Sequence, residues 1–129
     1  MRALVVDNDP ASRPDMIRML QSAGLMVASV TTYEAARACV TQNPPHLLVL
    51  DLTLPDGNGV ELLEQIRTQE LPISVAVVSG APNELLAQSI VLRPNALFDK
   101  PLDPEKFQAW LGRAIHRWQE ATASDAPTK

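Results

Sequence analysis

Cysteine is nearly absent from this chain, with Cys39 alone among 129 residues. A single cysteine forms neither an internal disulfide nor a thiolate metal cluster, so we expect a protein of the reducing cytoplasm. Aromatic residues make up only 4% of the chain, too few for a platform that stacks single-stranded nucleic acid. The formal net charge of -4 provides no basic excess to neutralise phosphates, so we expect no direct contact with nucleic acid.

Long apolar runs are missing as well. The apolar stretches at residues 47–50 and 73–78 are far shorter than the roughly 18 residues that cross a membrane. Asp7 follows the first apolar run too early for a signal-peptide core to form. We therefore expect no membrane contact. The hydrophobic fraction of 46% is enough for one buried core in a single domain.

Short apolar runs alternate along the chain with segments of helical spacing. The runs lie at residues 3–6, 26–30, 47–50, 73–78 and 96–98, and the helical segments at 11–23, 33–42, 58–68, 83–92 and 104–120. Continuous apolar runs are typical of strands buried on both faces of a parallel sheet, so the alternation predicts an α/β fold with right-handed crossovers. We place the domain at residues 1–120. Residues 121–129 carry no apolar stripe, and we expect them to form a flexible tail.

Polar side chains follow four of the five predicted strands. Asp7 comes after the first strand, Asp51 after the third, Ser79 after the fourth and Lys100 after the fifth. The carboxyl ends of parallel strands share one edge of the sheet, where ligands of such folds bind. Carboxylates, a hydroxyl and an ammonium suit Mg²⁺ and a phosphoryl group, and a carboxylate can itself accept that group as a nucleophile.

Each of these residues alone has a simpler interpretation. A single aspartate after a strand is usually a helix cap or a turn residue, and a single lysine is usually solvated. Asp51 differs because it follows the apolar run 47–50 and precedes Leu52 rather than a helix. A carboxylate at the end of a central strand is costly without a cation nearby. The convergence of the set therefore favours a phosphoryl site.

The segments around these positions resemble the receiver domain of two-component response regulators, in particular the single-domain, chemotaxis-regulator type. They are LVVDNDP at 4–10, LVLDLTLPDGNGVEL at 48–62, VVSG at 77–80 and DKPL at 99–102. The similarity covers residues 2–118 with the spacing of that family. It implies a flavodoxin-like fold, a doubly wound five-stranded parallel sheet of strand order 2-1-3-4-5.

The resemblance also implies a role for each residue at the strand ends. Asp51 is the implied acceptor of a phosphoryl group from a sensor histidine kinase or a phosphotransfer protein. Ser79 and Lys100 are then implied to bind phosphoryl oxygens, and the Lys100–Pro101 peptide bond to be cis. The implied Mg²⁺ ligands are Asp7, Asn8, Asp51 and the backbone carbonyl of Thr53. The resemblance implies a domain that accepts a phosphoryl group and can lose it by autodephosphorylation, and that is not a dedicated enzyme.

In this family the signal passes to partner proteins that bind at the face made by the fourth helix, the fifth strand and the fifth helix. The resemblance implies that a second copy or an effector protein binds there. Trp110 and Trp118 on the last helix are open to two interpretations, because tryptophan is usually buried but also anchors interfaces. Each is either a core residue or, if it borders this face, an anchor for a partner.

Two positions depart from the family pattern. The second acid after the first strand, which touches the metal in the family, is Asn8 here, so we expect weak Mg²⁺ binding. Asp9 follows it, and we expect Asp9 to face away or to cap the first helix. The switch aromatic three residues before the lysine is replaced by Leu97, and Phe98 should point to the opposite face of its strand. We therefore expect the switch to act mainly in the loop 80–84.

Other classes fit the residues less well. A dinucleotide site needs glycine in the turn after the first strand, and residues 7–10 contain none. A haloacid-dehalogenase phosphatase needs a second aspartate two residues after the nucleophile, where Thr53 stands. Two hypotheses stay open: a phosphorylatable receiver that relays a signal, and a receiver-like interaction module with weakened or lost phosphorylation and metal binding.

Overall fold

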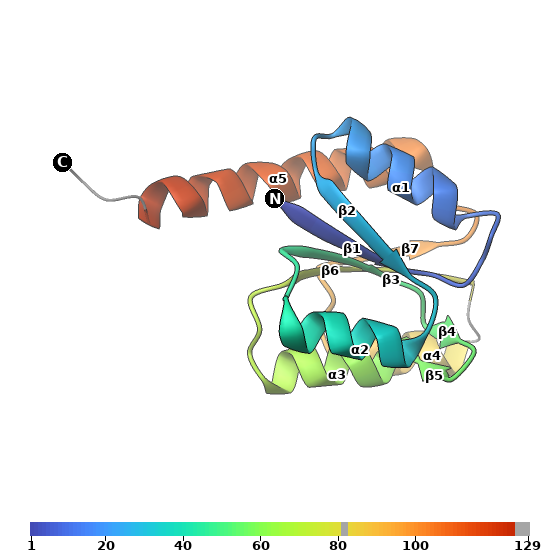
Figure 1. The fold of residues 1–129 in the computed structure, drawn as a ribbon. Helices are drawn as coiled ribbons and strands as arrows, with labels where there is room; N and C mark the ends of the chain where they lie inside the picture. The colour runs from blue at the N-terminus through green and yellow to red at the C-terminus, as the bar shows by residue number, and fades with distance from the viewer. Residues whose placement is uncertain (81–82, 126–129) are drawn as a thin grey trace.

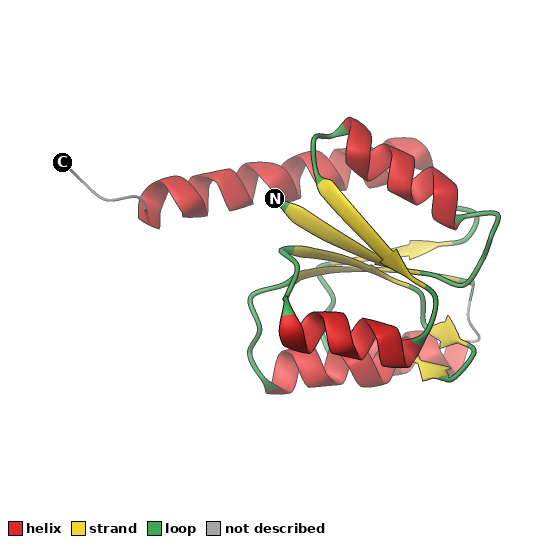
Figure 2. Cartoon of the chain, in the orientation of Figure 1, coloured by secondary structure: helices red, strands yellow, loops and turns green. Residues whose placement is uncertain are grey.

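The computed structural model describes residues 1–80 and 83–125, which form one parallel sheet covered by helices on both faces (Figures 1 and 2). In spatial order the strands are β2 (Met26–Val30), β1 (Arg2–Val6), β3 (Leu47–Leu50), β6 (Ser74–Ser79) and β7 (Ala96–Asp99). All neighbouring pairs in this sheet are parallel. The predicted order 2-1-3-4-5 is confirmed, with β6 and β7 as the fourth and fifth strands of the prediction.

Five helices complete the two outer layers. They are α1 (Arg13–Ser22), α2 (Tyr33–Gln42), α3 (Gly59–Thr68), α4 (Asn83–Val91) and α5 (Pro104–Asp125). Figure 1 shows α1 and α5 on one face of the sheet, with α2, α3 and α4 on the other. The sheet separates two apolar cores, because successive residues of a strand point to opposite faces.

The central strands show why the sequence runs are continuously apolar. In β1, Leu4 and Val6 pack toward α2 and α3, whereas Ala3 and Val5 pack toward α1 and α5. All four are buried, so a polar residue at any of them would lose its solvation without gaining a partner. Both faces of the central strands are therefore apolar, as the sequence predicted.

The edge strands differ from this expectation. At the β2 edge none of the five strand residues is buried, and Met26 at its start keeps 72% of its surface exposed. At the other edge β7 alternates: Phe98 packs beside Phe107 and Trp110, while Leu97 is 40% exposed. Phe98 thus lies on the α1–α5 face and Leu97 on the other, which confirms the predicted opposition of these two side chains.

A short hairpin follows β3 that the sequence did not predict. The proline, aspartate and glycine of this segment ordinarily indicate a simple turn into the third helix. Instead β4 (Thr53–Leu54) pairs antiparallel with β5 (Gly57–Asn58), and Asn58 then caps α3 through a hydrogen bond from Glu61 N. The two strands have two residues each, too few for any periodic pattern to reveal them.

The last helix begins as predicted and extends further. Asp103 accepts a hydrogen bond from Glu105 N at 3.0 Å and so caps a helix that starts at Pro104. The helix reaches Asp125, past residue 120 where we placed the start of a flexible tail, and residues 126–129 lie outside the described residues. Trp110 is 4% exposed and belongs to the core, which excludes it as an interface anchor.

Candidate phosphoryl and metal site

The carboxyl ends of the strands bring together the side chains that the sequence singled out. Asp7 follows β1, Asp51 follows β3 and Lys100 follows β7. The ammonium Nζ of Lys100 lies 2.9 Å from Oδ2 of Asp51 and 3.2 Å from Oδ1 of Asp7. Ser79 ends β6 and is 1% exposed, and its carbonyl accepts a hydrogen bond from Lys100 N at 3.3 Å.

Asp7 is completely buried and held on both carboxylate oxygens. Its Oδ1 accepts a hydrogen bond from Asp9 N at 2.8 Å in addition to the contact with Lys100. Its Oδ2 accepts a hydrogen bond from the hydroxyl of Ser12 at 2.7 Å. A buried carboxylate needs such partners, because an unpaired charge in the interior is strongly unfavourable. Asp7 is therefore fixed in orientation before any ligand binds.

The Asp51 carboxylate is more open to a reaction partner than that of Asp7. Its Oδ1 accepts a hydrogen bond from Thr53 N at 3.0 Å, and its Oδ2 faces the Lys100 ammonium. The Asp51 side chain is 10% exposed, whereas the Asp7 side chain has no exposed surface. Burial raises the pKa of Asp51 above its ordinary value, although the hydrogen bonds from Lys100 and Thr53 act against this rise.

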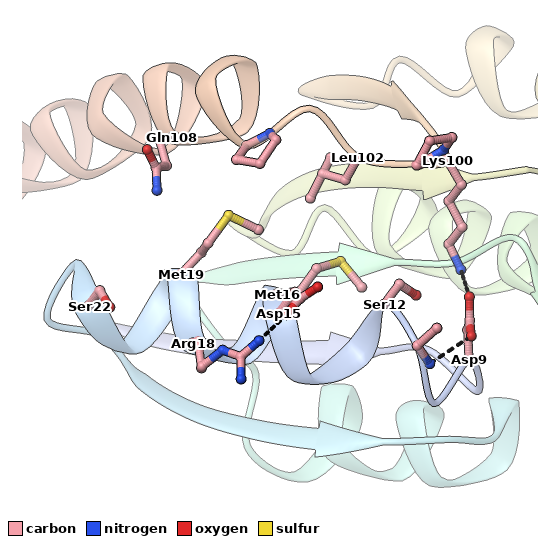
Figure 3. A pocket seen from close by; sticks show the side chains of 13 residues that line it. Asp9, Ser12, Asp15, Met16, Arg18, Met19, Ser22, Lys100, Leu102 and Gln108 are labelled. Carbon is pink, nitrogen blue, oxygen red and sulfur yellow. Dashed lines mark hydrogen bonds and ion pairs between the residues drawn. The ribbon is translucent and has the colours of Figure 1, made fainter.

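Lys100 keeps its charge in this setting. Burial by itself lowers the pKa of a lysine, but the hydrogen bond and the charge of Asp51, with those of Asp7, outweigh it and raise the pKa of Lys100. The side chain is 17% exposed and points into the acidic edge of the sheet (Figure 3). The peptide bond between Lys100 and Pro101 is cis, as the resemblance implied.

The two residues after Asp7 take different positions from those expected. Asn8 is exposed, whereas Asp9 turns back toward the site and places Oδ2 at 3.7 Å from Lys100 Nζ (Figure 3). The other oxygen of Asp9 accepts a hydrogen bond from Ala11 N, which lowers the pKa of Asp9. Asp9 therefore forms a local turn just before α1 and also faces Lys100. Of our two expectations for Asp9, the one in which it faces away is wrong.

One glycine is required by the approach of two chain segments at the site. The amide N–H of Gly59 donates a hydrogen bond to the carbonyl of Leu52 at 2.8 Å. A Cβ at residue 59 would lie 2.5 Å from the carbonyl oxygen of Asp51, closer than any ordinary contact. Glycine at this position therefore lets α3 begin directly against the acceptor segment.

The donor set fits a hard divalent cation. Asp7, Asp9 and Asp51 carry three negative charges around the one positive charge of Lys100, which leaves a net charge of -2. Mg²⁺ typically takes one or two carboxylates and keeps several waters, so it does not need a complete protein cage. Within residues 1–80 and 83–125, no group of three or more His, Cys, Asp or Glu side chains is placed to enclose a metal. Asp7, Asp9 and Asp51 are the carboxylates at this edge, and Asn8 and Thr53 are their neighbours in the chain.

A cleft of about 800 Å³ opens next to this site, between α1 and the start of α5. Asp9 and Lys100 stand at one end of it, and Met16, Met19 and Leu102 form an apolar wall (Figure 3). No pattern in the sequence points to Ser12 or to this cleft, because both depend on how the turn after β1 packs against the turn after β7. None of the helices in the described part of the chain is long and apolar enough to cross a membrane.

Known proteins share both the sequence pattern and the fold. Residues 3–111 match the family described as the response regulator receiver domain. The chain is 28% identical over 126 residues to the transcriptional regulatory protein FixJ of Bradyrhizobium diazoefficiens, an alignment that covers 95% of this chain and 60% of that protein. It is 33% identical over 124 residues to the DNA-binding transcriptional regulator NtrC of Klebsiella pneumoniae, covering 92% of this chain and 25% of that protein.

A solved structure shows the same architecture. The CheY-like response regulator receiver domain protein from Methanospirillum hungatei has a TM-score of 0.82 at 25% identity, with 93% of this chain and 97% of that chain covered. The chain thus spans nearly the whole of this solved neighbour. By contrast, it spans only 60% and 25% of the length of the two curated relatives.

Proposed function

The chain belongs to the response regulator receiver domain family, and on that premise we propose that Asp51 accepts a phosphoryl group from a sensor histidine kinase or a phosphotransfer protein. The observation that carries this proposal is the pairing of the partly exposed Asp51 carboxylate with the Lys100 ammonium at 2.9 Å. Receiver domains are signalling domains of two-component systems rather than dedicated enzymes. The transferred group then acts as a signal that alters protein contacts.

The proposed step is a displacement at phosphorus. One oxygen of Asp51 bonds to the phosphorus of a phosphohistidine while the P–N bond breaks, and its electron pair stays on the imidazole nitrogen. Lys100, already adjacent to Asp51, pairs with a phosphoryl oxygen, and the Ser79 hydroxyl donates a hydrogen bond to another. Attack of water on phosphorus later returns the free carboxylate and releases phosphate, which limits the lifetime of the signal.

The proposed cofactor is Mg²⁺, held by Asp7, Asn8, Asp51 and the backbone carbonyl of Thr53. Bound there, the cation supplies charge neutralisation for the phosphoryl oxygens. Support for this set comes from the net negative charge of the carboxylates around Lys100 and from the fixed orientation of Asp7. Asn8 contributes an amide oxygen in place of a carboxylate, so the proposed site binds Mg²⁺ weakly.

The proposed partners beyond the phosphodonor bind at the face made by α4, β7 and α5. Exposed apolar side chains on α4 and β7, Ile90, Val91 and Leu97, support an interaction with a second copy or an effector protein. The net charge of -4 supports an output that involves no direct contact between this chain and nucleic acid. A cytoplasmic location, with Cys39 reduced, is part of the same proposal.

A second candidate function is a receiver-like module that binds partners without phosphorylation. Two observations favour it: Asn8 in the metal-binding position of the family is exposed, and Leu97 replaces the switch aromatic. Phosphate labelling separates the two candidates. The receiver proposal predicts a mass increase of one phosphoryl group when the chain is treated with a small phosphodonor and Mg²⁺, and the interaction-module candidate predicts none.

The labelled residue is tested with two matched variants. Asp51→Asn should abolish the mass increase, while Asp15→Asn makes the same chemical change on an exposed part of α1 and should label like the wild type. Equal labelling of Asp51→Asn and the wild type would rule out Asp51 as the sole acceptor.

A further inference from the structure

The hairpin that follows the acceptor is short and separate from the main sheet. β4 and β5 form two residue pairs, Thr53 with Asn58 and Leu54 with Gly57. Two-stranded hairpins of this kind are marginally stable in water without further support. The position of the Thr53 carbonyl, one of the proposed Mg²⁺ ligands, therefore depends on contacts that hold the hairpin from outside.

Asp56 lies between the two strands of this hairpin and joins it to α2. Its Oδ1 accepts a hydrogen bond from Tyr33 N at 2.7 Å, and its Oδ2 accepts one from Glu34 N at 3.1 Å. These N–H groups belong to the first turn of α2 and have no acceptor within the helix. A negative charge there also interacts favourably with the positive end of the helix dipole. The hydrogen bonds from Tyr33 and Glu34 lower the pKa of Asp56, so the carboxylate is charged at neutral pH.

Tyr33 contacts the same hairpin through its ring. A Cβ added at Gly57 would lie 3.3 Å from Cγ of Tyr33, so the ring packs directly against the glycine. The junction between the hairpin and α2 therefore has two parts, the paired hydrogen bonds of Asp56 and this ring contact. Both join the acceptor loop to the start of a helix that follows the edge strand β2.

We propose that Asp56 is a positioning residue for the metal site: by binding the first turn of α2 it holds the β4–β5 hairpin, and with it the Thr53 carbonyl, in place for Mg²⁺. This inference rests on the Mg²⁺ site proposed above. Capping of α2 alone would be a simpler role for Asp56. However, α2 already has an N-cap, because Thr32 Oγ accepts a hydrogen bond from Ala35 N at 3.1 Å.

Thr32 provides the matched control, since its capping bond lies within α2 itself. The experiment titrates the full chain with Mg²⁺ alone, followed by amide NMR, in the wild type, Asp56→Ala, Asp56→Asn and Thr32→Ala. Asp56→Ala and Thr32→Ala each remove capping of the same helix, so both should lower the melting temperature. Only Asp56→Ala should weaken Mg²⁺ binding, by roughly five-fold, which corresponds to the net value of one of the two hydrogen bonds that Asp56 accepts.

Two further measurements distinguish positioning from general stability. Asp56→Asn keeps one acceptor oxygen and should restore part of the Mg²⁺ affinity that Asp56→Ala loses. In the metal-free protein, exchange of the Gly59 amide proton, which donates to the Leu52 carbonyl at the base of the hairpin, should accelerate in Asp56→Ala and stay at the wild-type rate in Thr32→Ala. This exchange measurement reports on the hairpin without any metal present.

The outcomes separate this inference from the proposed function. Equal Mg²⁺ affinity in the wild type and Asp56→Ala would overturn the inference alone. Equal weakening in Thr32→Ala would also overturn it, because the stability of α2 would then explain the effect. A wild-type chain that binds no Mg²⁺ would overturn the Mg²⁺ site and this inference together, while labelling of Asp51 would be judged by its own experiment.

Discussion

Asp51 is less well solvated in the folded protein than in the unfolded chain. Burial raises its pKa, and the hydrogen bonds from Lys100 and Thr53 offset the rise only in part. A group whose pKa is higher in the folded state stabilises the fold below its unfolded pKa, and this contribution is lost as pH rises through the folded pKa. At neutral pH the charged Asp51 carboxylate therefore lowers the stability of the fold. The proposed reaction nevertheless requires the carboxylate in its charged form.

We accordingly expect Asp51→Asn to melt at a higher temperature than the wild type at pH 7. A gain of a few degrees corresponds to about 1 kcal/mol in a domain of this size. The gain should shrink as pH falls through the raised pKa of Asp51, because the wild-type carboxylate then becomes neutral as well. Calorimetry of both proteins at neutral and acidic pH measures the difference, and a lower melting temperature for Asp51→Asn at pH 7 would contradict this account.

Asn8 is the residue at which a single added charge should improve the proposed metal site. Two unit charges about 4 Å apart interact by about 4 kcal/mol at an effective dielectric constant of 20, and desolvation and screening at an exposed position remove most of this. A remaining gain of about 1 kcal/mol would make Mg²⁺ binding by Asn8→Asp about five-fold tighter. Titration with Mg²⁺ by amide NMR measures it. If Asn8→Asp binds no more tightly than the wild type, residue 8 lies outside the metal site.

The sequence predicted the residues that end the strands and missed those that depend on the turns. Asp7, Asp51, Ser79 and Lys100 follow apolar runs, and parallel strands must end at one edge, so their convergence follows from the fold class. The orientation of Asp9 depends on a turn closed by its own hydrogen bond to Ala11 N. No pattern in the sequence distinguishes that turn from one in which the carboxylate faces solvent.

Among the elements, α3 and α5 each contain a glycine, and the two differ in what surrounds them. A Cβ at Gly59 would meet the Asp51 carbonyl at 2.5 Å, whereas a Cβ at Gly112 would have nothing within 4 Å. We expect Gly59→Ala to destabilise the fold by about 1–3 kcal/mol, as overpacking does. Gly112→Ala, inside α5, should instead stabilise it by about 0.5–1 kcal/mol. Urea unfolding of both variants is the measurement, and similar changes in both would refute the close approach at α3.

β7 is the element through which a change at the site would reach the partner face. Leu97 has no ring or hydroxyl and is 40% exposed, while Phe98 packs on the other face of the sheet beside Phe107 and Trp110. We therefore expect a phosphoryl mimic to shift β7 little and to shift the start of α4 more. Of the predicted switch loop 80–84, residues 81 and 82 lie outside the described residues.

Amide NMR with and without beryllofluoride and Mg²⁺ tests this expectation. Shifts should appear at residues 7–9 and 51–53 and extend into residues 79–90. Shifts confined to the first two segments would mean that the site binds the mimic without switching. The interaction-module hypothesis would then be preferred.

The β4–β5 hairpin marks the limit of prediction at this scale. Its sequence, from Thr53 to Asn58, contains proline, aspartate and glycine, which ordinarily indicate a turn. The hairpin also makes contacts outside itself: Asp56 accepts a hydrogen bond from Tyr33 N in the first turn of α2, and Gly57 packs against the Tyr33 ring. Both contacts join segments about twenty residues apart in the chain, beyond the reach of local propensity.

For the whole molecule, the alternation of strands and helices predicted the α/β class, while the strand order came from the resemblance to receiver domains. Spacing alone does not say which strands lie at the edges, and Met26 shows the consequence. Its run resembles the buried ones, yet β2 lies at an edge and leaves Met26 72% exposed. The convergence of Asp7, Asp51 and Lys100 at one edge nevertheless follows directly from a parallel sheet.

The central claim, that this edge carries phosphate on Asp51, is tested most directly by locating the modified residue. Borohydride reduces an aspartyl phosphate to homoserine, so treatment of the chain with a small phosphodonor and Mg²⁺, then borohydride and proteolysis, marks the acceptor in a peptide mass spectrum. We predict homoserine at position 51 alone, dependent on both the phosphodonor and Mg²⁺. Homoserine at another aspartate with position 51 unmodified, or no homoserine at all, would contradict the account.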